Sequence, residues 1–411
     1  MTRPDKRRAR AIGGACIATI VAMLLVVPAA LAGASTWEPI EKISDTGQPA
    51  AGSSIATTKS GGHRYLHAAF RRDAGKVLYA RSSNGGGSWS SPTKLADIGM
   101  VYGEPRIAAG GNDIWIAFAR RYTDPDTGTP GKAIVVRHNG RHGAPSAWDK
   151  QIRLTSKDGD VRAPSIAVTR GGDSIYVTYS NLRDDSTRVI ASHNGGRTWT
   201  TTTVGVGFEQ DGEDVPVVVP VVAAAGDNAV VAWLAEGNVA TARITTNGGD
   251  SWSDEVAVGE GLSAAAARVG RLAVAGTREG GIAWVRVWND DAWGDVQDVP
   301  QVMFGAETAS SVDVDVVLRK DNRVGVVYSA QLDVDEETAD TWEEIHWFQS
   351  ADEGETWGAG QLVSRAGGVD AAFDAARPTA IWLDGGRLWV AWQQEKLNTP
   401  GDDFFAIRER P

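Results

Sequence analysis

Three arginines in this chain stand beside a proline in a short motif, and together they could grip an anion. Arg106 ends the run Glu104-Pro105-Arg106, Arg162 opens Arg162-Ala163-Pro164, and Arg377 precedes Pro378. Proline favours the first residue of a strand, where its missing N–H costs little. Guanidinium groups are planar donor forks that match a carboxylate, so three of them around one centre would bind an acidic sugar. The alternative, which this acid-rich sequence favours, is that each arginine pairs with a neighbouring carboxylate.

Carboxylates near the same motifs could supply acid–base chemistry. Hydrolysis of a glycosidic bond uses two carboxyl groups, of which one is protonated and one is charged. The candidates are Asp184, in the polar run Arg183-Asp184-Asp185, and the glutamates Glu104 and Glu213. The other acids that could contribute are Asp160, Asp214, Asp370 and Asp374. So many acids also fit a solvated rim, and the sequence alone favours that simpler interpretation.

Residues that bind metals form only weak patterns. The run Asp124-Pro125-Asp126-Thr127-Gly128 alternates oxygen ligands in a way that suits calcium, but it lacks the glutamate that ends a complete calcium loop. The six histidines form no helical ligand pair. Paired glycines do not stand at strand-to-helix junctions, where a phosphate loop would need them. We therefore predict no cofactor, with calcium as the alternative.

The beginning of the chain predicts export. Residues 3–10 include five basic side chains, residues 17–27 are apolar, and small residues follow up to Ala34. This order is typical of a secretory signal peptide. We expect cleavage after Ala32 or Ala34 and a secreted domain over residues 35–411, with an uncleaved anchor helix as the alternative. The apolar run is short for a bilayer span of about 20 residues, and no second run of membrane length follows.

The charge and cysteine content restrict the function further. The chain of 411 residues has 41 Lys and Arg against 52 Asp and Glu, a net charge of −11. Loss of residues 1–34 removes five basic residues and one acidic residue, which leaves 36 against 51 and a net charge of −15. Such a balance argues against nucleic-acid binding. The one cysteine, Cys16, lies in the predicted signal, so the exported domain must fold without disulfides.

Positioning of these candidates depends on an internal repeat. An octapeptide of the form Ser/Thr-x-Asn/Asp-x-Gly-x-Ser/Thr-Trp recurs four times, at residues 82–89, 192–199, 245–252 and 350–357. Asn or Asp starts a tight turn by bonding to its own backbone. Glycine accepts the positive φ that such a turn needs. The tryptophan can fold back onto a neighbouring strand, so each copy predicts a β-hairpin turn with its own packing anchor.

The octapeptide resembles the Asp-box (BNR) repeat of sialidase-like β-propellers. In that family the boxes join the third and fourth strands of a blade and are structural. The resemblance implies that a ligand would lie at the opposite end, over the axis, where the inner strands begin. Sialidases bind a carboxylate there with three arginines, and Arg162 partly matches the motif of the first, although the aromatic residue of that motif is missing. Asp184 or Asp185 matches the acid/base aspartate of the family in loop position only.

Short apolar strands recur in step with the turns. They occupy residues 65–70, 114–118, 175–179, 229–233, 272–276, 324–328 and 388–392, and degenerate turns fill the gaps at residues 138–148 and 288–293. Seven tryptophans mark outer strands: Trp37, Trp89, Trp148, Trp199, Trp252, Trp293 and Trp357. Residues 36–40 resemble the end of an octapeptide turn followed by an outer strand. Residues 404–408 resemble a third strand that is not followed by a turn and an outer strand of its own. We predict an all-β, seven-bladed β-propeller, with six blades as the alternative, closed by an N-terminal strand that completes the last blade.

Two functions fit this sequence. The first is a secreted propeller that binds a glycan, a cell-wall polymer or an extracellular protein at the axial end opposite the boxes. The second is a glycoside hydrolase or lyase that acts on an acidic glycan. Known sialidases have six blades, so a seventh blade favours binding. A propeller fold by itself hosts many functions and does not decide between them. We also expect a monomer with no membrane span after signal cleavage.

Overall fold

The computed structural model divides the chain into two units, residues 1–35 and 36–411. It describes residues 37–44, 50–72, 75–97, 104–123, 128, 130–156, 159–206, 220–289, 291–304, 307–319, 321–335, 340–364, 375–383, 386–396 and 399–409. The predicted signal, residues 1–34, lies outside them. Within the described residues, no helix combines the length and apolar character needed to cross a membrane.

The described residues of the second unit form seven antiparallel blades. Blades 1 to 3 consist of β2 (Ala50–Ser60), β3 (His63–Arg72), β4 (Lys76–Ser82) and β5 (Thr93–Asp97), then β6 (Arg106–Gly110), β7 (Asp113–Thr123), β8 (Pro130–Asn139) and β9 (Ile152–Arg153), then β10 (Val161–Val168), β11 (Ile175–Asn181), β12 (Ser186–Ser192) and β13 (Thr200–Val206). Blade 4 consists of β14 (Val221–Ala225), β15 (Asn228–Ala235), β16 (Val239–Thr245) and β17 (Val256–Glu260). Short 3₁₀ helices occur at Pro145–Ala147 and Glu236–Asn238.

Blades 5 to 7 follow the same plan with two additions. Blade 5 contains β18 (Ala264–Arg268), β19 (Arg271–Arg278) and β20 (Ile282–Asn289), with the short outer strands β21 (Ala292–Trp293) and β22 (Gln297–Asp298). A small hairpin of β23 (Met303–Phe304) and β24 (Glu307–Thr308) precedes blade 6, which comprises β25 (Ser310–Leu318), β26 (Val324–Asp335), β27 (Asp340–Ser350) and β28 (Gln361–Leu362). Blade 7 comprises β29 (Ala375–Trp382), β30 (Leu388–Lys396), β31 (Thr399–Arg408) and β1 (Glu41–Lys42).

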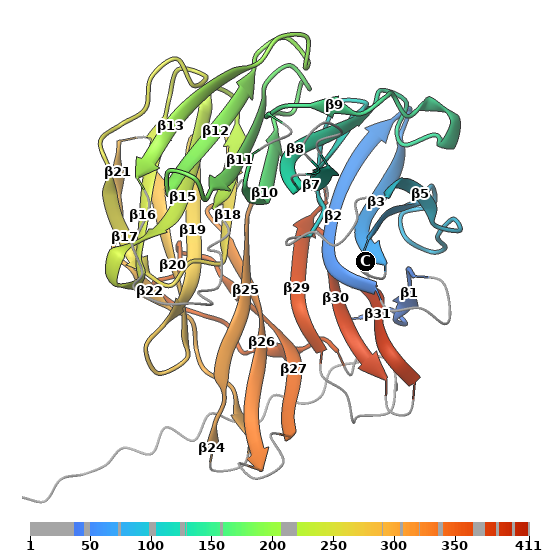
Figure 1. Cartoon of the computed structure of the whole chain (residues 1–411). Coiled ribbons are helices and arrows are strands. Elements are labelled where there is room, and N and C mark those ends of the chain that lie inside the picture. The colour runs from blue at the N-terminus through green and yellow to red at the C-terminus, as the bar shows by residue number, and fades with distance from the viewer. Residues whose placement is uncertain are drawn as a thin grey trace, which may run out of the picture. The chain divides into compact units, whose positions relative to one another are not determined.

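The seven predicted apolar strands are all second strands of blades, and the prediction of seven blades is confirmed. The inner strands β2, β6, β10, β14, β18, β25 and β29 contact one another in that order, and β29 contacts β2. In Figure 1 the blades accordingly run around a ring from blue through green, yellow and orange to red, where red meets blue again.

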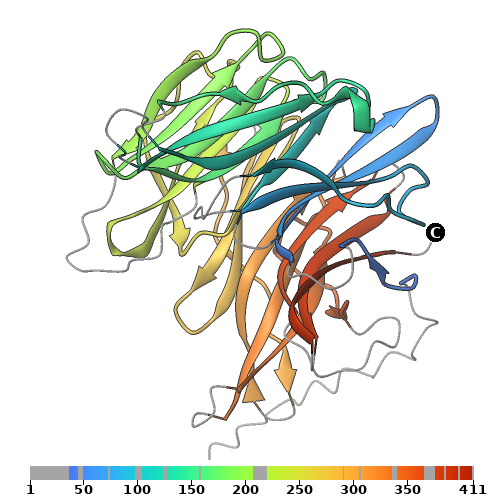
Figure 2. The same ribbon diagram turned by 45° about the vertical axis from the view of Figure 1, so that its right-hand side comes forward.

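The last blade is split between the two ends of the second unit, as predicted. Strand β1 pairs with β31 through Glu41 and Ala406, and Trp37 forms a bridge with Glu409. The dark-blue β1 therefore lies beside the dark-red β31 in Figure 2. Lys42 Nζ lies 2.6 Å from Asp403 Oδ2, and Ser44 Oγ donates to Asp403 Oδ1 at 3.0 Å. Strand β1 thus covers the edge of β31, which would otherwise be open to pairing with another chain.

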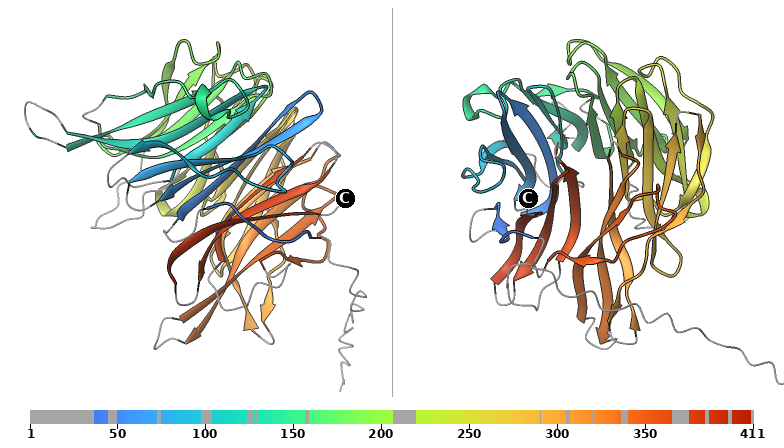
Figure 3. Two further views of the ribbon diagram at one scale, coloured as in Figure 1. Left: turned by 90° about the vertical axis from the view of Figure 1, so that its right-hand side faces the viewer. Right: turned by 180° about the vertical axis from the view of Figure 1, so that it is seen from behind.

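The apolar core lies between blades, whose sheets stand face to face in Figure 3. One buried cluster joins blades 3 and 4, another joins blades 4 and 5, and others join blades 5 and 6, 6 and 7, and 7 and 1. The second strands supply much of this core because they are buried on both faces. Residues Ile114 to Ala119 of β7, for example, are all buried. The sequences of such strands are continuous apolar runs, and this pattern allowed them to be predicted from the sequence.

The four octapeptides form one turn, repeated between the third and fourth strands. In the second copy Ser192 Oγ accepts the N–H of Gly196 at 2.9 Å, and Asn194 Oδ1 accepts the N–H of Thr198 at 2.9 Å. The other three copies contain the same pair of hydrogen bonds. All these bonds join residues four apart, so the turn is encoded locally.

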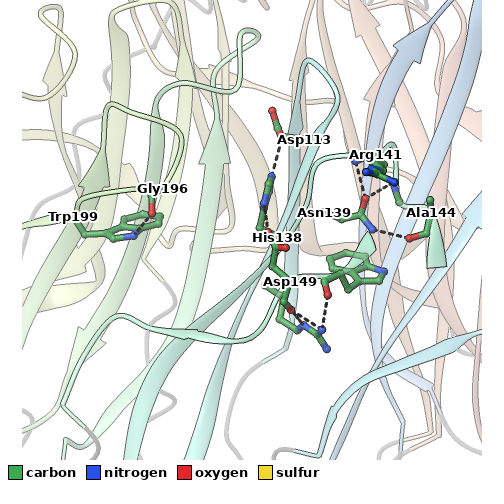
Figure 4. A network of polar contacts seen from close by, with 11 residues as sticks. Asp113, His138, Asn139, Arg141, Ala144, Asp149, Gly196 and Trp199 are labelled. Atoms are coloured by element: carbon green, nitrogen blue, oxygen red, sulfur yellow. Dashed lines mark hydrogen bonds and ion pairs between the residues drawn. The ribbon is translucent and has the colours of Figure 1, made fainter. Parts of the chain in front are cut away.

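The degenerate turn of blade 2 follows a related plan (Figure 4). Asn139 Oδ1 accepts the N–H groups of Arg141 and Gly143, at 2.9 and 3.0 Å. His138 lies between Asp113 and Asp149, with 2.7 Å from a ring nitrogen to each carboxylate. The His138 ring also stacks on the Trp115 ring at a centroid distance of 4.4 Å. Both ring nitrogens are thus engaged, so His138 anchors the turn.

Candidate functional site

The inner strands carry a repeated irregularity near their beginnings. Strands β2, β10, β25 and β29 each contain a β-bulge, and one residue in each bulge has a positive φ. These residues are Gly52, Ala163, Asp313 and Arg377, with φ of 71°, 52°, 45° and 53°. A bulge re-aims a side chain relative to the regular alternation of a strand. The three non-glycine residues hold a backbone conformation that L-residues rarely adopt. Such strained residues cluster at functional sites, so this end of the inner strands is a candidate site.

Hydrogen bonds between neighbouring inner strands align these bulges around the axis. Ile107 N–H donates to Ser54 Oγ of the preceding blade at 3.0 Å, and Ala380 N–H donates to Asp315 Oδ2 at 2.8 Å. Val222 N–H reaches Ser165 Oγ in the same way at 3.4 Å. Each acceptor side chain stands two residues after a bulge residue. These hydrogen bonds define equivalent positions in different blades. Glu104 in blade 2 lies three residues before Ile107, and Arg377 in blade 7 lies three residues before Ala380, so Glu104 and Arg377 are equivalent.

Four consecutive blades therefore present one residue each at this level. They are Asp313 in blade 6, Arg377 in blade 7, Gly52 in blade 1 and Glu104 in blade 2. Together with Arg106, which follows Glu104 by two residues, they form what we call the axial cluster. The cluster thus combines two acids with two bases around a glycine.

Glu104 is the centre of the axial cluster. It forms an ion pair with Arg377, 273 residues away in sequence, through Oε1 and Nη1. Its other oxygen, Oε2, lies 3.8 Å from Arg106 Nη2. To reach Arg377 the side chain crosses Gly52, where an added β-carbon would collide with Glu104. Gly52 N–H donates to Gln393 Oε1 at 3.1 Å, which places an amide beside the two ion pairs.

Two aspartates of β25 complete the site. Part of the Asp313 side chain is exposed to solvent. Atoms of the surrounding blades still displace much of the water around its carboxyl group, and this desolvation raises its pKa. The positive charge of Arg377 opposes the rise. Burial also raises the pKa of Asp315, whose Oδ2 and Oδ1 accept the N–H groups of Ala380 and Val316. Asp315 is therefore committed to joining two blades. Asp313 belongs to the axial cluster and has a raised pKa.

The structure brings Arg106 and Arg377 together but places Arg162 in a different pair. Arg162 Nε lies 3.9 Å from Asp160 Oδ1, and the same oxygen is 2.7 Å from Lys132 Nζ of blade 2. Arg162 directly precedes the bulge residue Ala163, whereas Arg377 is itself a bulge residue. Each of the three predicted arginines thus has a carboxylate within ion-pair distance.

The predicted acids differ in their surroundings. Asp184 lies in the β11–β12 turn, accepts the hydroxyl of Ser186 at 2.6 Å and pairs with Arg188. Burial acts to raise the pKa of Asp184, but the hydrogen bond from Ser186 and the charge of Arg188 outweigh it and hold the pKa below its ordinary value. The other predicted acids, Glu213, Asp214, Asp370 and Asp374, lie outside the described residues.

Residues 124–127 of the predicted calcium loop also lie outside the described residues. Among those that are described, no three His, Cys, Asp or Glu residues gather closely enough to hold a metal ion. Calcium binding at residues 124–128 therefore stays a prediction.

Asp313, Gly52 and Gln393 belong to the site but were missed in the sequence. None of them stands next to a proline motif, which was the signal used to find Glu104 and the arginines. The bulges that place Asp313 and Gly52 at the level of Arg377 appear only in the strand pairing, so no local sequence signal could have found these residues.

Comparisons with known proteins concern the fold. No family model matches the chain, and no curated protein matches it. Solved structures that resemble it include a polysaccharide lyase, the ulvan lyase bound to -[GlcA(1-4)Rha3S]-, with a TM-score of 0.58, 13% identity and coverage of 89% of this chain and 95% of that one. A protein of unknown function from Dyadobacter fermentans has a TM-score of 0.51, 14% identity and coverage of 90% and 99%.

The comparison also includes the sialidase of Trypanosoma rangeli in complex with the inhibitor DANA. Its TM-score is 0.48 with 10% identity, and the match covers 91% of this chain and 59% of that one. Identities this low carry over the fold and not the activity. The chain is a β-propeller, in a form with seven blades.

Proposed function

We propose that this protein is an exported, Asp-box-type propeller that binds a glycan at the axial cluster. The observation that carries the proposal is the ion-paired group of Glu104, Arg377 and Arg106, which lies where the inner strands of blades 2 and 7 begin. Arg377 and Arg106 keep 47% and 36% of their side-chain area exposed, so a ligand could reach both guanidinium groups. Carboxylates and guanidinium forks are well suited to vicinal sugar hydroxyls, which both donate and accept hydrogen bonds.

Export and the position of the octapeptide turns support this proposal. The signal-like order of basic, apolar and small residues over residues 1–34 fits an exported domain. The turns lie between the third and fourth strands, and the axial cluster lies at the other end of the inner strands. A cell-wall polymer would bind through the same sugar chemistry. An extracellular protein is the alternative partner, and a glycan array separates it from a carbohydrate.

The test is glycan binding by residues 35–411 and by three variants. We expect Arg377→Ala and Glu104→Ala to lose tenfold or more in affinity for the glycan that the unaltered protein binds, in line with the loss of hydrogen bonds to charged groups, about 1.5–3 kcal/mol. Arg243→Ala is the matched control, because Arg243 also pairs with a glutamate, Glu255, at 2.9 Å but lies on a third strand away from the axis. Binding that survives both axial variants would place the glycan elsewhere, and no binding to any glycan would refute the proposal.

A second candidate function, that of a glycoside hydrolase or a polysaccharide lyase, has one observation in its favour. Asp313, whose pKa is raised, and Glu104 are two acids of the same cluster, and glycosidases use two carboxyl groups for acid–base chemistry. Asp184 fits a general acid less well because its pKa is lowered. Release of a sugar from a fluorogenic panel, abolished by Asp313→Asn and by Glu104→Gln, would favour catalysis over binding alone.

A further inference from the structure

Within the proposed glycan binding, the geometry points to a specificity role for Glu104: by occupying the guanidinium groups of Arg377 and Arg106, it makes the axial cluster select neutral sugars and reject acidic ones. The inference rests on the proposed function and goes beyond it by naming the ligand class. It reverses the expectation from the sequence, in which the arginines would grip the carboxylate of an acidic sugar.

The first step in the argument is the position of Glu104. Its side chain is 16% exposed, less than half the exposed fraction of either arginine that it contacts. One oxygen pairs with Arg377 and the other faces Arg106. The carboxylate of Glu104 thus takes the place between the two guanidinium groups that a ligand carboxylate would need.

Gly52 makes this arrangement possible. Of the four equivalent positions on blades 6, 7, 1 and 2, it is the one without a side chain. Glu104 lies against its Cα, where any β-carbon would collide with it. Because blade 1 leaves this gap, a glutamate from blade 2 can reach across to blade 7. The pair between Glu104 and Arg377 is therefore built into the fold, since a glycine and two bulged strands position it.

The second step is the energy of a competing ligand. A ligand carboxylate that binds between the two guanidinium groups would have to displace Glu104 and would leave it near Asp313 without its counter-charges. One that binds the exposed face of Arg106 instead would lie beside the negative charge of Glu104. Separation of a close ion pair without replacement is unfavourable, and like charges near each other add to the penalty. A sugar hydroxyl needs no displacement. It can donate to a Glu104 oxygen and accept from an N–H of the Arg106 guanidinium, which has five donors and whose side chain is 36% exposed.

The charge of the whole domain acts in the same direction. Residues 35–411 carry 36 basic and 51 acidic side chains, a net charge of −15. A field of this sign lowers the local concentration of anionic polymers and leaves neutral ones unaffected. The two arginines at the axis would have to overcome that field, and Glu104 neutralises one of their two charges.

The experiment compares residues 35–411 with Glu104→Gln on an array of neutral and uronate-containing glycans. This substitution keeps the shape of the side chain and removes its charge. We expect the unaltered protein to bind neutral glycans, and Glu104→Gln to gain at least tenfold in affinity for uronates. The gained affinity should fall as salt is added, because it depends on exposed charges. Glu255→Gln is the matched control, because Glu255 also pairs with an arginine, Arg243, and it should leave the preference unchanged.

A second variant guards against an indirect effect. Gly52→Ala keeps every charge of the cluster but pushes Glu104 away from Arg377, so it should shift the preference towards uronates as well. Thermal melting shows whether each variant is folded, and Glu104→Ala replaces any variant that is not. Preferential binding of uronates by the unaltered protein would overturn the inference and leave glycan binding intact. Failure of every protein to bind any glycan would instead refute the proposed function, and the inference with it.

Discussion

At the scale of the residue, two substitutions in the fourth octapeptide turn change its charge and its contacts. Glu353 stands where the other three octapeptides have glycine and keeps a positive φ of 64°. Its carboxylate lies 3.1 Å from Arg271 Nε of blade 5, so an inter-blade ion pair offsets local strain. Asp352 likewise replaces an asparagine. Hydrogen bonds from Thr356 and Ser350 lower the pKa of Asp352 to about 2.

The lowered pKa of Asp352 predicts an acid-sensitive turn. In the unfolded chain this carboxyl titrates near 3.8 and in the turn near 2, so its contribution is complete above about pH 4 and is lost as the pH falls towards 2. Asp352→Asn should remove this dependence and be nearly neutral at pH 7, because Asn194 makes the same turn. Urea midpoints at pH 6 and pH 3 provide the measurement. An equal loss of stability on acidification in both proteins would contradict the assignment.

At the scale of the element, each turn fastens its blade to the preceding one. Trp199 packs edge-on against Trp115 of blade 2 with a centroid distance of 5.9 Å, and Trp89 and Trp252 meet aromatic residues of blades 7 and 3 in the same way. The second glycine of the turn approaches the same ring. At Gly196 an added β-carbon would collide with Trp115, whereas at Gly195 it would meet nothing. The octapeptide is therefore an inter-blade contact as well as a turn.

These adjacent glycines make a matched pair of variants. Both have a positive φ, 67° for Gly195 and 81° for Gly196, so alanine strains the backbone at both. Only Gly196→Ala also pushes against Trp115, and overpacking of this kind costs about 1–3 kcal/mol. We expect Gly196→Ala to lower the free energy of unfolding by that much more than Gly195→Ala in urea titrations. Equal losses would show that the turn does not depend on the ring beneath it.

At the scale of the whole molecule, stability depends on closure of the ring. Trp37 is 4% exposed, Glu38 pairs with Arg408, and Asp403 accepts bonds from both Lys42 and Ser44. Arg408 also donates to the carbonyl of Gly85 in blade 1 at 3.0 Å, so the split blade is tied to its neighbour across the closure. In a domain without cysteine these contacts hold the two ends together.

Removal of the closing strand should therefore destabilise the entire ring. Deletion of residues 36–44 from a protein of residues 35–411 exposes the edge of β31 and loses Trp37, whose removal alone costs about 3–5 kcal/mol for a buried tryptophan. We expect a marked fall in the melting temperature. A truncated domain that melts like the intact one would refute closure by the split blade.

A point substitution separates the closing contacts from the loss of the whole strand. Asp403→Asn removes the charge that pairs with Lys42 and should cost about 1–3 kcal/mol, because Asp403 is buried. Asp97→Asn is the control, since Asp97 also pairs with a lysine, Lys94, but both side chains are exposed, so its effect should be small. Urea titrations of the two variants give the comparison. Equal effects would mean that the closing pair contributes no more than a surface pair.

The sequence by itself determined the scaffold. The octapeptide turns are made by hydrogen bonds between residues four apart, and the second strands are continuous apolar runs, so both are visible in a local window. The split blade was predictable because each end of the domain lacks the part that the other supplies. Arg106, Arg377 and Glu104 were found because a neighbouring proline marks the start of an inner strand.

Tertiary structure alone decided how these residues meet. The pair of Glu104 and Arg377 spans 273 residues and crosses a glycine in a third blade, and no local pattern records that contact. The bulges that aim Asp313 and Arg377, and the hydrogen bonds that align them, depend on the register between sheets that are distant in sequence. Local turns and strands follow from short-range physics. The site arises from packing between blades, which exists only once the ring has closed.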